Sequence, residues 1–495
     1  MNSSPVPPFE DEQFRTPLFD AMVSLAESHK VSFHTPGHKS GKGISTRFRK
    51  YVGPRIFSID LTTLDEVDSL QNPTGVIKEA QELSAKACGA DRSYFLVNGT
   101  TVGNHAMVAS MTGPGDKVLI ARNCHRSVLT GLIMSGAQPF FFQPAFDRNL
   151  KLTLNITFDT AKQAIDEHPD AKVLLITSPN YYGLCADIER IIPYAHDKGL
   201  IVLVDEAHGP HLKFNPKLPK SALECGADLC VQSTHKIVGG MTQASMLHAK
   251  SGRINVDDVT NTLKLLQTTS PSYILMASLD LARMQMATEG KKLLNRTIKL
   301  SEEARTAINK LKGIFCFGKD HAKQAGMSDM DVTKLTITVS DLGLSGYTVS
   351  HLLNTRYGIQ VEMADPFHVL VIVSIGDRQD DLNRLTNALR QIAEETGLQG
   401  ALLPLDKVHP PILQNRFAMT PRKAFYSDTE LVNIDQAVSR VSAEIVTVYP
   451  PGIPLLMPGE EISREAIDYL RNMAGLGAII DGMNENNTLI RVVKA

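Results

Sequence analysis

The chain has 495 residues, of which 43% are hydrophobic and 21% charged, a composition typical of globular domains and not of disordered or low-complexity chains. At about 150 residues per domain, this length predicts two or three domains. The 51 lysines and arginines against 53 aspartates and glutamates leave a net charge of −2, so the chain as a whole lacks the basic excess of a nucleic-acid-binding protein.

The cysteines and the N-terminus predict a cytoplasmic protein. Six cysteines are scattered along the chain, which favours a reducing compartment over a disulfide framework. Cys225 and Cys230 are not followed by a second Cys or His pair, so we expect no zinc or other metal site. Residues 1–5 lack the basic flank and apolar run of a signal peptide.

One uncharged stretch has the length of a membrane span. Residues 127–146 carry no charged side chain, but Gly131, Gly136 and Pro139 interrupt them. A buried helix followed by a strand explains this pattern better than a membrane span. We therefore expect no membrane segment here.

Between about residues 94 and 245, short apolar runs alternate with helical stretches. The expected strands are residues 94–97, 117–120, 139–142, 173–176, 201–204 and 229–231. Helices are expected at residues 160–167 and 188–198. Apolar strands separated by helices predict an α/β fold, with a mostly parallel sheet covered on both faces.

Polar residues follow four of these runs, at residues 123–125, 177–181, 205–208 and 233–236. Ligands of parallel sheets bind beyond the carboxyl ends of the strands, so the chemistry is expected there.

The second half of the chain predicts further units. Residues 263–311 have the pattern of one long helix. A second alternation follows, with strands at 335–339 and 369–373 and helices at 346–355 and 380–394, which indicates a small α/β domain. Beyond about residue 404 the chain is rich in proline, and its pattern predicts no particular fold.

The sequence Asp-Glu-Ala-His at residues 205–208 resembles the metal-binding box of helicase-type NTPases. That function also needs a phosphate-binding loop of the form G-x-x-x-x-G-K-[ST]. Residues 37–43 are the nearest candidate, and their spacing is wrong. The NTPase interpretation is therefore not favoured.

Pyridoxal phosphate fits the same residues better. It needs a carboxylate at its ring nitrogen, a flat partner for the ring, a phosphate site and a lysine that forms an imine with its aldehyde. The carboxylate could be that of Asp205, and the flat partner could be His125. The phosphate site could be residues 98–103 (Asn-Gly-Thr-Thr-Val-Gly), and the imine-forming lysine could be Lys236.

Each feature alone has a simpler explanation, because strand-end aspartates are usually caps and most lysines are surface charges. The four together, each just after an expected strand, favour the cofactor.

Five motifs carry a family resemblance: residues 34–39 (His-Thr-Pro-Gly-His-Lys), 98–101, 205–209, 233–236 and 449–454 (Tyr-Pro-Pro-Gly-Ile-Pro). Together they resemble the bacterial ornithine/lysine/arginine decarboxylase family of fold type I pyridoxal-phosphate enzymes, over about residues 16–461. The resemblance implies an aspartate aminotransferase-like large domain with a mostly parallel sheet, followed by smaller α/β domains. It divides the chain into an N-terminal segment (1–55), a PLP-binding large domain (56–325), a small α/β domain (326–400) and a C-terminal decarboxylase domain (401–495).

Residues 34–39 lie close to the N-terminus of the sequence, so we expect no receiver-like domain of the kind that the large acid-inducible members carry. The chain is thus similar to the short biosynthetic form. The resemblance implies decarboxylation of L-arginine to agmatine in polyamine biosynthesis, by a homodimer or higher homo-oligomer.

Carried over to this sequence, the resemblance implies a role for each motif residue. Lys236 would bind the cofactor aldehyde covalently, Asp205 would bind the ring nitrogen, and His125 and Ala207 would lie on its two faces. The phosphate would be bound by Gly99, Thr100, Thr101, Ser233 and His235. His208 would stand near the substrate, His235 or Lys236 would protonate Cα, and Glu460 would approach the distal cation of the substrate.

Other functions remain open at this point. Lysine and ornithine also carry a distal cation, so either can replace arginine as the substrate. The same cofactor serves aminotransferases and aldolases, and a relative that has lost its chemistry would act as a regulatory protein. Retention of both Lys236 and Asp205 argues against the last alternative.

Overall fold

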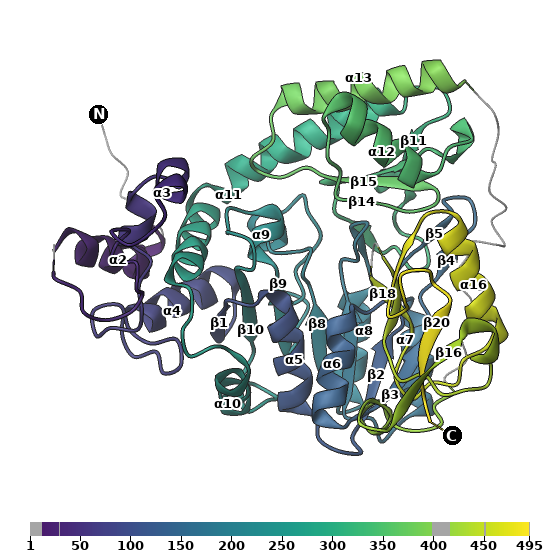
Figure 1. Ribbon diagram of the computed structural model, residues 1–495, viewed down its shortest axis with the longest axis horizontal. Coiled ribbons are helices and arrows are strands. Elements are labelled where there is room, and N and C mark those ends of the chain that lie inside the picture. The colour runs from purple at the N-terminus through teal and green to yellow at the C-terminus, as the bar shows by residue number, and fades with distance from the viewer. Residues whose placement is uncertain (1–11, 29, 398–415, 450–451, 495) are drawn as a thin grey trace.

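A computed structural model describes residues 12–28, 30–397, 416–449 and 452–494 of the chain. Its centre is a seven-stranded sheet in the order β1-β10-β9-β8-β6-β2-β3 (Figure 1). Neighbouring strands are parallel except where β10 pairs with β1 and β9, so the prediction of a mostly parallel sheet is confirmed. The strands are β1 (Arg92–Leu96), β2 (Lys117–Ala121), β3 (Gln138–Phe142), β6 (Val173–Thr177), β8 (Ile201–Asp205), β9 (Leu229–Gln232) and β10 (Ser245–Ala249).

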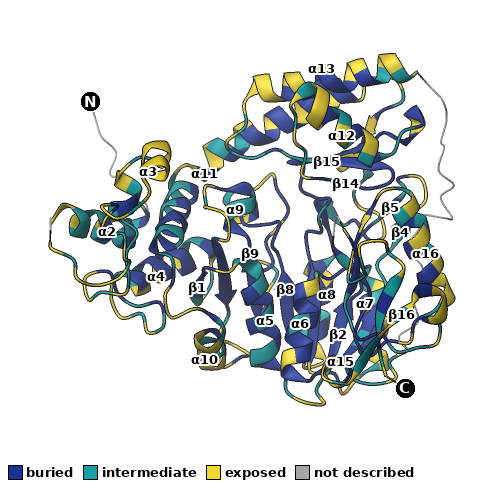
Figure 2. Cartoon of the chain, in the orientation of Figure 1, coloured by how far each residue is buried: buried dark blue, intermediate teal, exposed yellow. Residues whose placement is uncertain are grey.

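Helices cover both faces of this sheet. One face packs against α5 (Gly99–Met111), α6 (Arg126–Ser135) and α10 (Val256–Leu266). The other face packs against α7 (Phe158–Glu167) and α8 (Ile188–Asp197). Figure 2 shows the strands as a buried layer between helices whose outer sides are exposed. The sheet is buried on both faces, which explains why its strands read as continuous apolar runs.

The uncharged stretch forms α6 followed by β3, as the sequence predicted. In the part of the chain that the structure describes, no helix is both long and apolar enough to cross a membrane.

The long helix is shorter than predicted. Residues 263–266 end α10, and the 36-residue helix α11 runs over Tyr273–Ile308. Pro271 lies between them and has no N–H group to continue a helix, so the chain turns before α11 begins. The Ser272 side chain caps α11 by accepting a hydrogen bond from the Leu275 N–H.

The small domain has a four-stranded antiparallel sheet in the order β11-β13-β15-β14. Its core reaches back to Leu300 in α11. In Figure 1 this domain lies beyond the end of the large sheet that carries α9 (Thr234–Ile237). The elements are β11 (Phe315–Cys316), β13 (Lys334–Thr338), β14 (Met363–Ala364), β15 (His368–Ile372), α12 (Gly346–Tyr357) and α13 (Gln379–Thr396). A separate two-stranded ribbon, β7 (Leu184–Cys185) with β12 (Asp329–Met330), joins the two domains.

The C-terminal part forms a three-stranded sheet, β18-β17-β19, and a two-stranded sheet, β16-β20. Its elements are α15 (Pro421–Phe425), β16 (Thr429–Asn433), β17 (Val446–Tyr449), β18 (Ile453–Leu456), α16 (Arg464–Gly475), β19 (Ile479–Asp481) and β20 (Leu489–Val493). The N-terminal part contains α2 (Pro17–Glu27), α3 (Thr46–Val52) and α4 (Val76–Cys88). Residues 1–5, the predicted boundary near residue 400, and Pro450 and Pro451 of the 449–454 motif lie outside the described residues.

Replacing Gly103 with alanine should destabilise the fold. A Cβ atom at Gly103 would lie 2.8 Å from Leu96 Cδ1 and would also overlap Val231, because α5 packs closely on the sheet here. Overpacking of this kind lowers the free energy of unfolding by about 1–3 kcal/mol. The measurement is the urea concentration at the midpoint of unfolding, which should fall. Gly252→Ala is the control, since no atom lies within 4 Å of its added Cβ. Equal midpoints for the two variants would contradict the close packing.

Candidate functional site

Asp205 ends β8 at the carboxyl edge of the sheet, and its side chain is only 2% exposed. Its Oδ2 accepts a hydrogen bond of 2.8 Å from Asn104 Nδ2, and its Oδ1 accepts one of 3.1 Å from the Ala207 N–H. Two donors therefore hold a buried carboxylate in one orientation. Glu206 points elsewhere, since its carboxylate accepts hydrogen bonds from the Ala222 N–H and from Gln232 Nε2.

Lys236 lies on α9, and its Nζ is 2.9 Å from His208 Nε2. Burial lowers the pKa of Lys236, and the negative charges of Asp205 and Glu362 oppose this shift. Burial, and next the charge of Lys236, holds the pKa of His208 well below its ordinary value. His208 is thus neutral, and in the tautomer that carries its proton on Nδ1 its Nε2 accepts a hydrogen bond from the Lys236 amine. The ring of Tyr181 adjoins both, 5.9 Å from Lys236 Nζ and 5.1 Å from the His208 ring.

The start of α5 meets the segment that precedes α9. Thr100 Oγ1 lies 3.1 Å from Ser233 Oγ, and Thr101 occupies the first turn of α5. Gly99 has φ +66°, and no atom lies within 4 Å of the position a Cβ would take. Hydroxyl groups, free N–H groups at a helix start and an open backbone together suit a phosphate dianion.

His125 caps α6 and belongs to the same hydrogen-bond network as Asp205. Its Nδ1 accepts a hydrogen bond of 3.2 Å from the Ser127 N–H. Ser127 Oγ also accepts a hydrogen bond of 2.9 Å from Asn104 Nδ2, the donor to Asp205. Burial lowers the pKa of His125.

His235 precedes Lys236 on α9 and is half-buried, and its backbone N–H donates to the Ala244 carbonyl over 3.1 Å. Burial, and next the charge of Lys236, lowers the pKa of His235. The predicted residues from α5, α6, the segment after β8 and α9 therefore all lie at one edge of the sheet.

Glu460 takes part in a buried ion pair within the chain. Its two carboxylate oxygens accept hydrogen bonds of 2.7 and 3.0 Å from the Arg122 guanidinium, and both side chains are buried. The Met457 N–H also donates to Glu460 over 3.0 Å. Both Glu460 oxygens are thus engaged within the described chain, and the assignment of Glu460 to the distal cation stays a prediction.

Three residues at the site were not given a role from the sequence. Asn104 lies one turn after Thr100 in α5, so the period of a helix could have identified it. Tyr181 lies in the polar segment after β6, but nothing in the sequence distinguished it there. Glu362 precedes β14 in the small domain, and no sequence signal connected it with Lys236.

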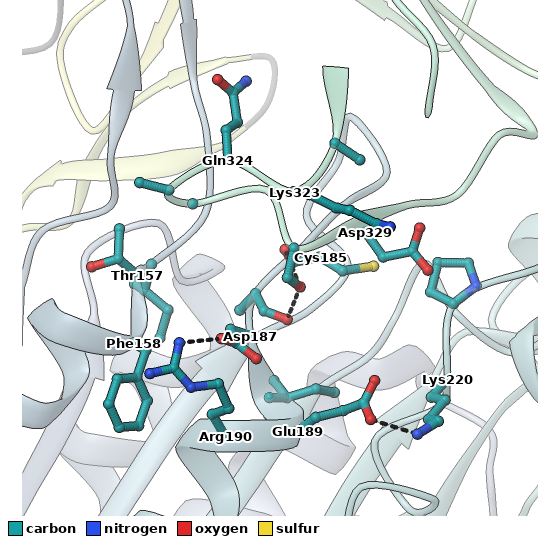
Figure 3. Close-up of a pocket in the computed structure, with 18 of the residues that line it drawn as sticks. Thr157, Phe158, Cys185, Asp187, Glu189, Arg190, Lys220, Lys323, Gln324 and Asp329 are labelled. Atoms are coloured by element: carbon teal, nitrogen blue, oxygen red, sulfur yellow. Dashed lines mark hydrogen bonds and ion pairs between the residues drawn. The ribbon is translucent and has the colours of Figure 1, made fainter. Parts of the chain in front are cut away.

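A separate cavity of about 970 Å³ lies where α7 and α8 begin, facing residues 319–329 (Figure 3). Most of its charged groups are paired, as in Lys220 with Glu189 and Arg190 with Asp187. Neither Asp205 nor Lys236 is among the residues that line it. The chemistry therefore lies elsewhere.

The arrangement meets the needs of pyridoxal phosphate that the sequence suggested. A buried carboxylate, a lysine of lowered pKa and a phosphate-sized group of donors lie at one sheet edge. Buried polar groups must find partners, and His208 Nδ1 has none among the described residues. The site is thus built to receive a further polar molecule.

Comparisons with known proteins agree with this chemistry. The sequence profile of the Orn/Lys/Arg decarboxylase major domain matches residues 16–381, and that of the C-terminal domain matches residues 411–486. An arginine decarboxylase of Bacillus anthracis is 42% identical over 97% of this chain and 98% of its own length. The inducible lysine decarboxylase of Escherichia coli (strain K12) is 29% identical over 95% of this chain and 79% of its own length.

A solved structure, the lysine decarboxylase LdcF of Francisella novicida, superposes with a TM-score of 0.86 at 23% identity. The superposed residues cover 98% of this chain and 82% of the LdcF chain. At this identity the structural likeness establishes the fold alone.

Replacing Glu362 with glutamine should lower the pH at which the Lys236 amine becomes reactive. The Glu362 charge favours the ammonium form of Lys236, so its removal lowers the pKa of Lys236 further. The measurement is the rate of Lys236 acetylation against pH, followed by peptide mass spectrometry on protein freed of small molecules. Glu485→Gln, at an exposed position, is the control. An unchanged midpoint in Glu362→Gln would show that this carboxylate does not act on Lys236.

Proposed function

This chain belongs to the Orn/Lys/Arg decarboxylase family, and we propose that it decarboxylates L-arginine to agmatine and carbon dioxide with pyridoxal 5'-phosphate as cofactor. The family match identifies an amino-acid decarboxylase. The proposal rests on one observation above all, the buried carboxylate of Asp205 and the Lys236–His208 pair at the same edge of the sheet.

Arginine is favoured over lysine by the relatives. The Bacillus relative at 42% identity is named an arginine decarboxylase, whereas the lysine decarboxylase of Escherichia coli is 29% identical. Both substrates carry a positive charge at the end of the side chain. Glu362 is exposed, and its negative charge raises the pKa of Lys236. We propose that Glu362, in place of Glu460, binds the distal cation of the substrate.

The residues at the sheet edge would bind pyridoxal phosphate in defined ways. Lys236 would hold its aldehyde carbon through Nζ, and Asp205 would keep its ring nitrogen protonated, because a buried negative charge stabilises a neighbouring positive one. When bound, the cofactor supplies an electron-withdrawing ring conjugated to the substrate amine. The phosphate would be bound by Gly99, Thr100, Thr101, Ser233 and His235, and the ring would lie between His125 and Ala207.

Proton transfer to the substrate falls to the groups around Lys236. His208 is neutral and 2.9 Å from Lys236 Nζ, so a proton can pass between these two atoms. We propose that this pair delivers the proton that Cα needs after carbon dioxide leaves. His235 precedes Lys236 on α9 and is the second candidate donor.

A homodimer or higher homo-oligomer in the cytoplasm is proposed as the working form. Apolar side chains of the N-terminal part are almost fully exposed in the single chain, among them Phe33 at 93% and Tyr51 at 90%. A second copy of the chain would cover them, since large exposed apolar groups usually mark an interface. All six cysteines are free, which suits a reducing compartment.

The purified chain with pyridoxal phosphate should release carbon dioxide and agmatine from L-arginine faster than it produces diamines from L-lysine or L-ornithine. Lys236→Ala should abolish both turnover and the imine absorbance, because it removes the amine that binds the aldehyde. Lys299→Ala, at an exposed lysine, is the control and should keep both. Keto-acid products would indicate transamination, and no product with any basic amino acid would contradict the proposal.

Asp205→Asn should lower kcat by about 10²-fold or more, because the variant removes the charge that keeps the ring nitrogen protonated. Glu206→Gln is a matched control, because Glu206 points away from Asp205. Burial raises the pKa of Glu206 to about 7, so the neutral amide resembles the protonated form that is already present near neutral pH. The measurement is steady-state turnover with saturating cofactor. Equal losses in both variants would refute the assignment of Asp205.

A further inference from the structure

A buried charged cluster lies where the small domain meets the large one, and the proposed reaction uses none of its members. We define it by His211, Asp331 and Lys334. His211 Nε2 is 3.1 Å from Asp331 Oδ2, and both side chains are 0% exposed. Lys334 is also 0% exposed, and its Nζ has no hydrogen-bond partner among the described residues. Burying an ammonium group without a hydrogen-bond partner lowers the stability of the fold. Lys334 at this position is therefore a candidate for a functional role.

The cluster adjoins the turn that carries Tyr181. The Asp331 N–H donates to the Gly183 carbonyl over 2.8 Å, which extends the β7–β12 ribbon between the domains. A Cβ atom at Gly183 would lie 2.7 Å from Lys334 Cγ, so the Lys334 side chain lies directly against this turn. Tyr181, two residues before Gly183, adjoins the His208 ring and Lys236 Nζ.

The cluster is also joined to His208 through the chain itself. His211 follows His208 by three residues, and the Leu212 N–H donates to the Gly209 carbonyl over 3.1 Å within this compact segment. His208 is therefore connected to the cluster from two sides, through the turn at Tyr181 and through the segment that ends at His211. Movement of the cluster would move both neighbours of Lys236.

The charges that face Lys334 come from several elements. Burial and the charge of Lys236 together lower the pKa of Lys334 to about 8, against the opposing charges of Asp331 and Glu362. Burial by itself raises the pKa of Asp331, but His211 and Lys334 hold it below its ordinary value. Arg305 donates to the backbone carbonyl of Lys334 and adds a further positive group.

His208 is surrounded mainly by positive or neutral groups. After burial, the charges that lower its pKa belong to Lys236, Lys334, His125 and His211. Below about pH 8 Lys334 carries its charge and so contributes to keeping His208 neutral. A neutral His208 can accept the hydrogen bond from Lys236.

We infer that Lys334, together with Asp331, is a positioning residue for the decarboxylation, holding Tyr181 and His208 against Lys236 from the small domain. The inference rests on the proposed function. It adds that β13 of the small domain, and not only the sheet edge of the large one, contributes to the state of the catalytic lysine.

The test is a pH titration of the cofactor absorbance in the complex without substrate, together with kcat and KM. Lys334→Met removes a positive charge that repels a cation at position 236, so the absorbance midpoint should move up by about 0.5–1 pH unit. We expect kcat to fall by about tenfold with KM nearly unchanged, because the variant disturbs proton transfer and not substrate contacts. Lys334→Arg keeps the charge and should keep the midpoint of the natural chain.

Lys299→Met, at an exposed lysine, is the control and should change neither quantity. If Lys334→Met does not fold, Lys334→Gln carries the same expectation, since it removes the charge and keeps a polar end. A folded Lys334→Met or Lys334→Gln variant with an unchanged midpoint and kcat would overturn the inference. The titration needs no substrate, so its result tests the role of Lys334 even if the unmodified chain does not decarboxylate arginine. Absence of arginine decarboxylation would contradict the proposed function alone.

Discussion

The carboxylate of Asp205 is the group on which the rest of the site depends. A buried charge is stable only if donors surround it, and α5 supplies one of them through Asn104. Asn104 also binds Ser127, which in turn binds His125 at the start of α6. One hydrogen-bond network therefore fixes the carboxylate, the proposed phosphate-binding end of α5 and the proposed ring partner relative to one another.

The same constraint explains why α5 lies so close to the sheet. Gly103 precedes Asn104, and a larger residue would collide with Leu96 and Val231. The absence of a side chain at one position thus allows the amide at the next to reach the strand end. The close placement of α5 on the sheet therefore determines both the packing of the core and the position of the Asn104 amide at the site.

The C-terminal and small domains contribute in different ways. Arg122 follows β2 and binds Glu460 and the Leu455 carbonyl, so this buried ion pair fastens the C-terminal part to the large domain. Breaking such a pair would leave a buried charge alone, so the pair contributes to holding these two parts together. The small domain instead brings Glu362 and Lys334 towards Lys236, one exposed and one buried. The candidate site at the edge of the large sheet is thus also influenced by charged residues of the small domain.

The sequence by itself determined six of the seven strands of the large sheet, because a sheet buried on both faces requires continuous apolar runs whatever surrounds them. It did not indicate β10 (Ser245–Ala249). It also determined that Asp205 and Lys236 share an edge, since parallel strands bring their carboxyl ends together. The sequence could not show that Glu206 turns to Ala222 and Gln232, that Arg122 occupies Glu460, or that Pro271 divides the predicted long helix. Only the tertiary structure decided which charges act on one another across the domains, as those of Glu362 and Lys236 do. The physical reason is that local pattern records the periodicity of one segment, whereas ion pairs depend on distances between segments far apart in the chain.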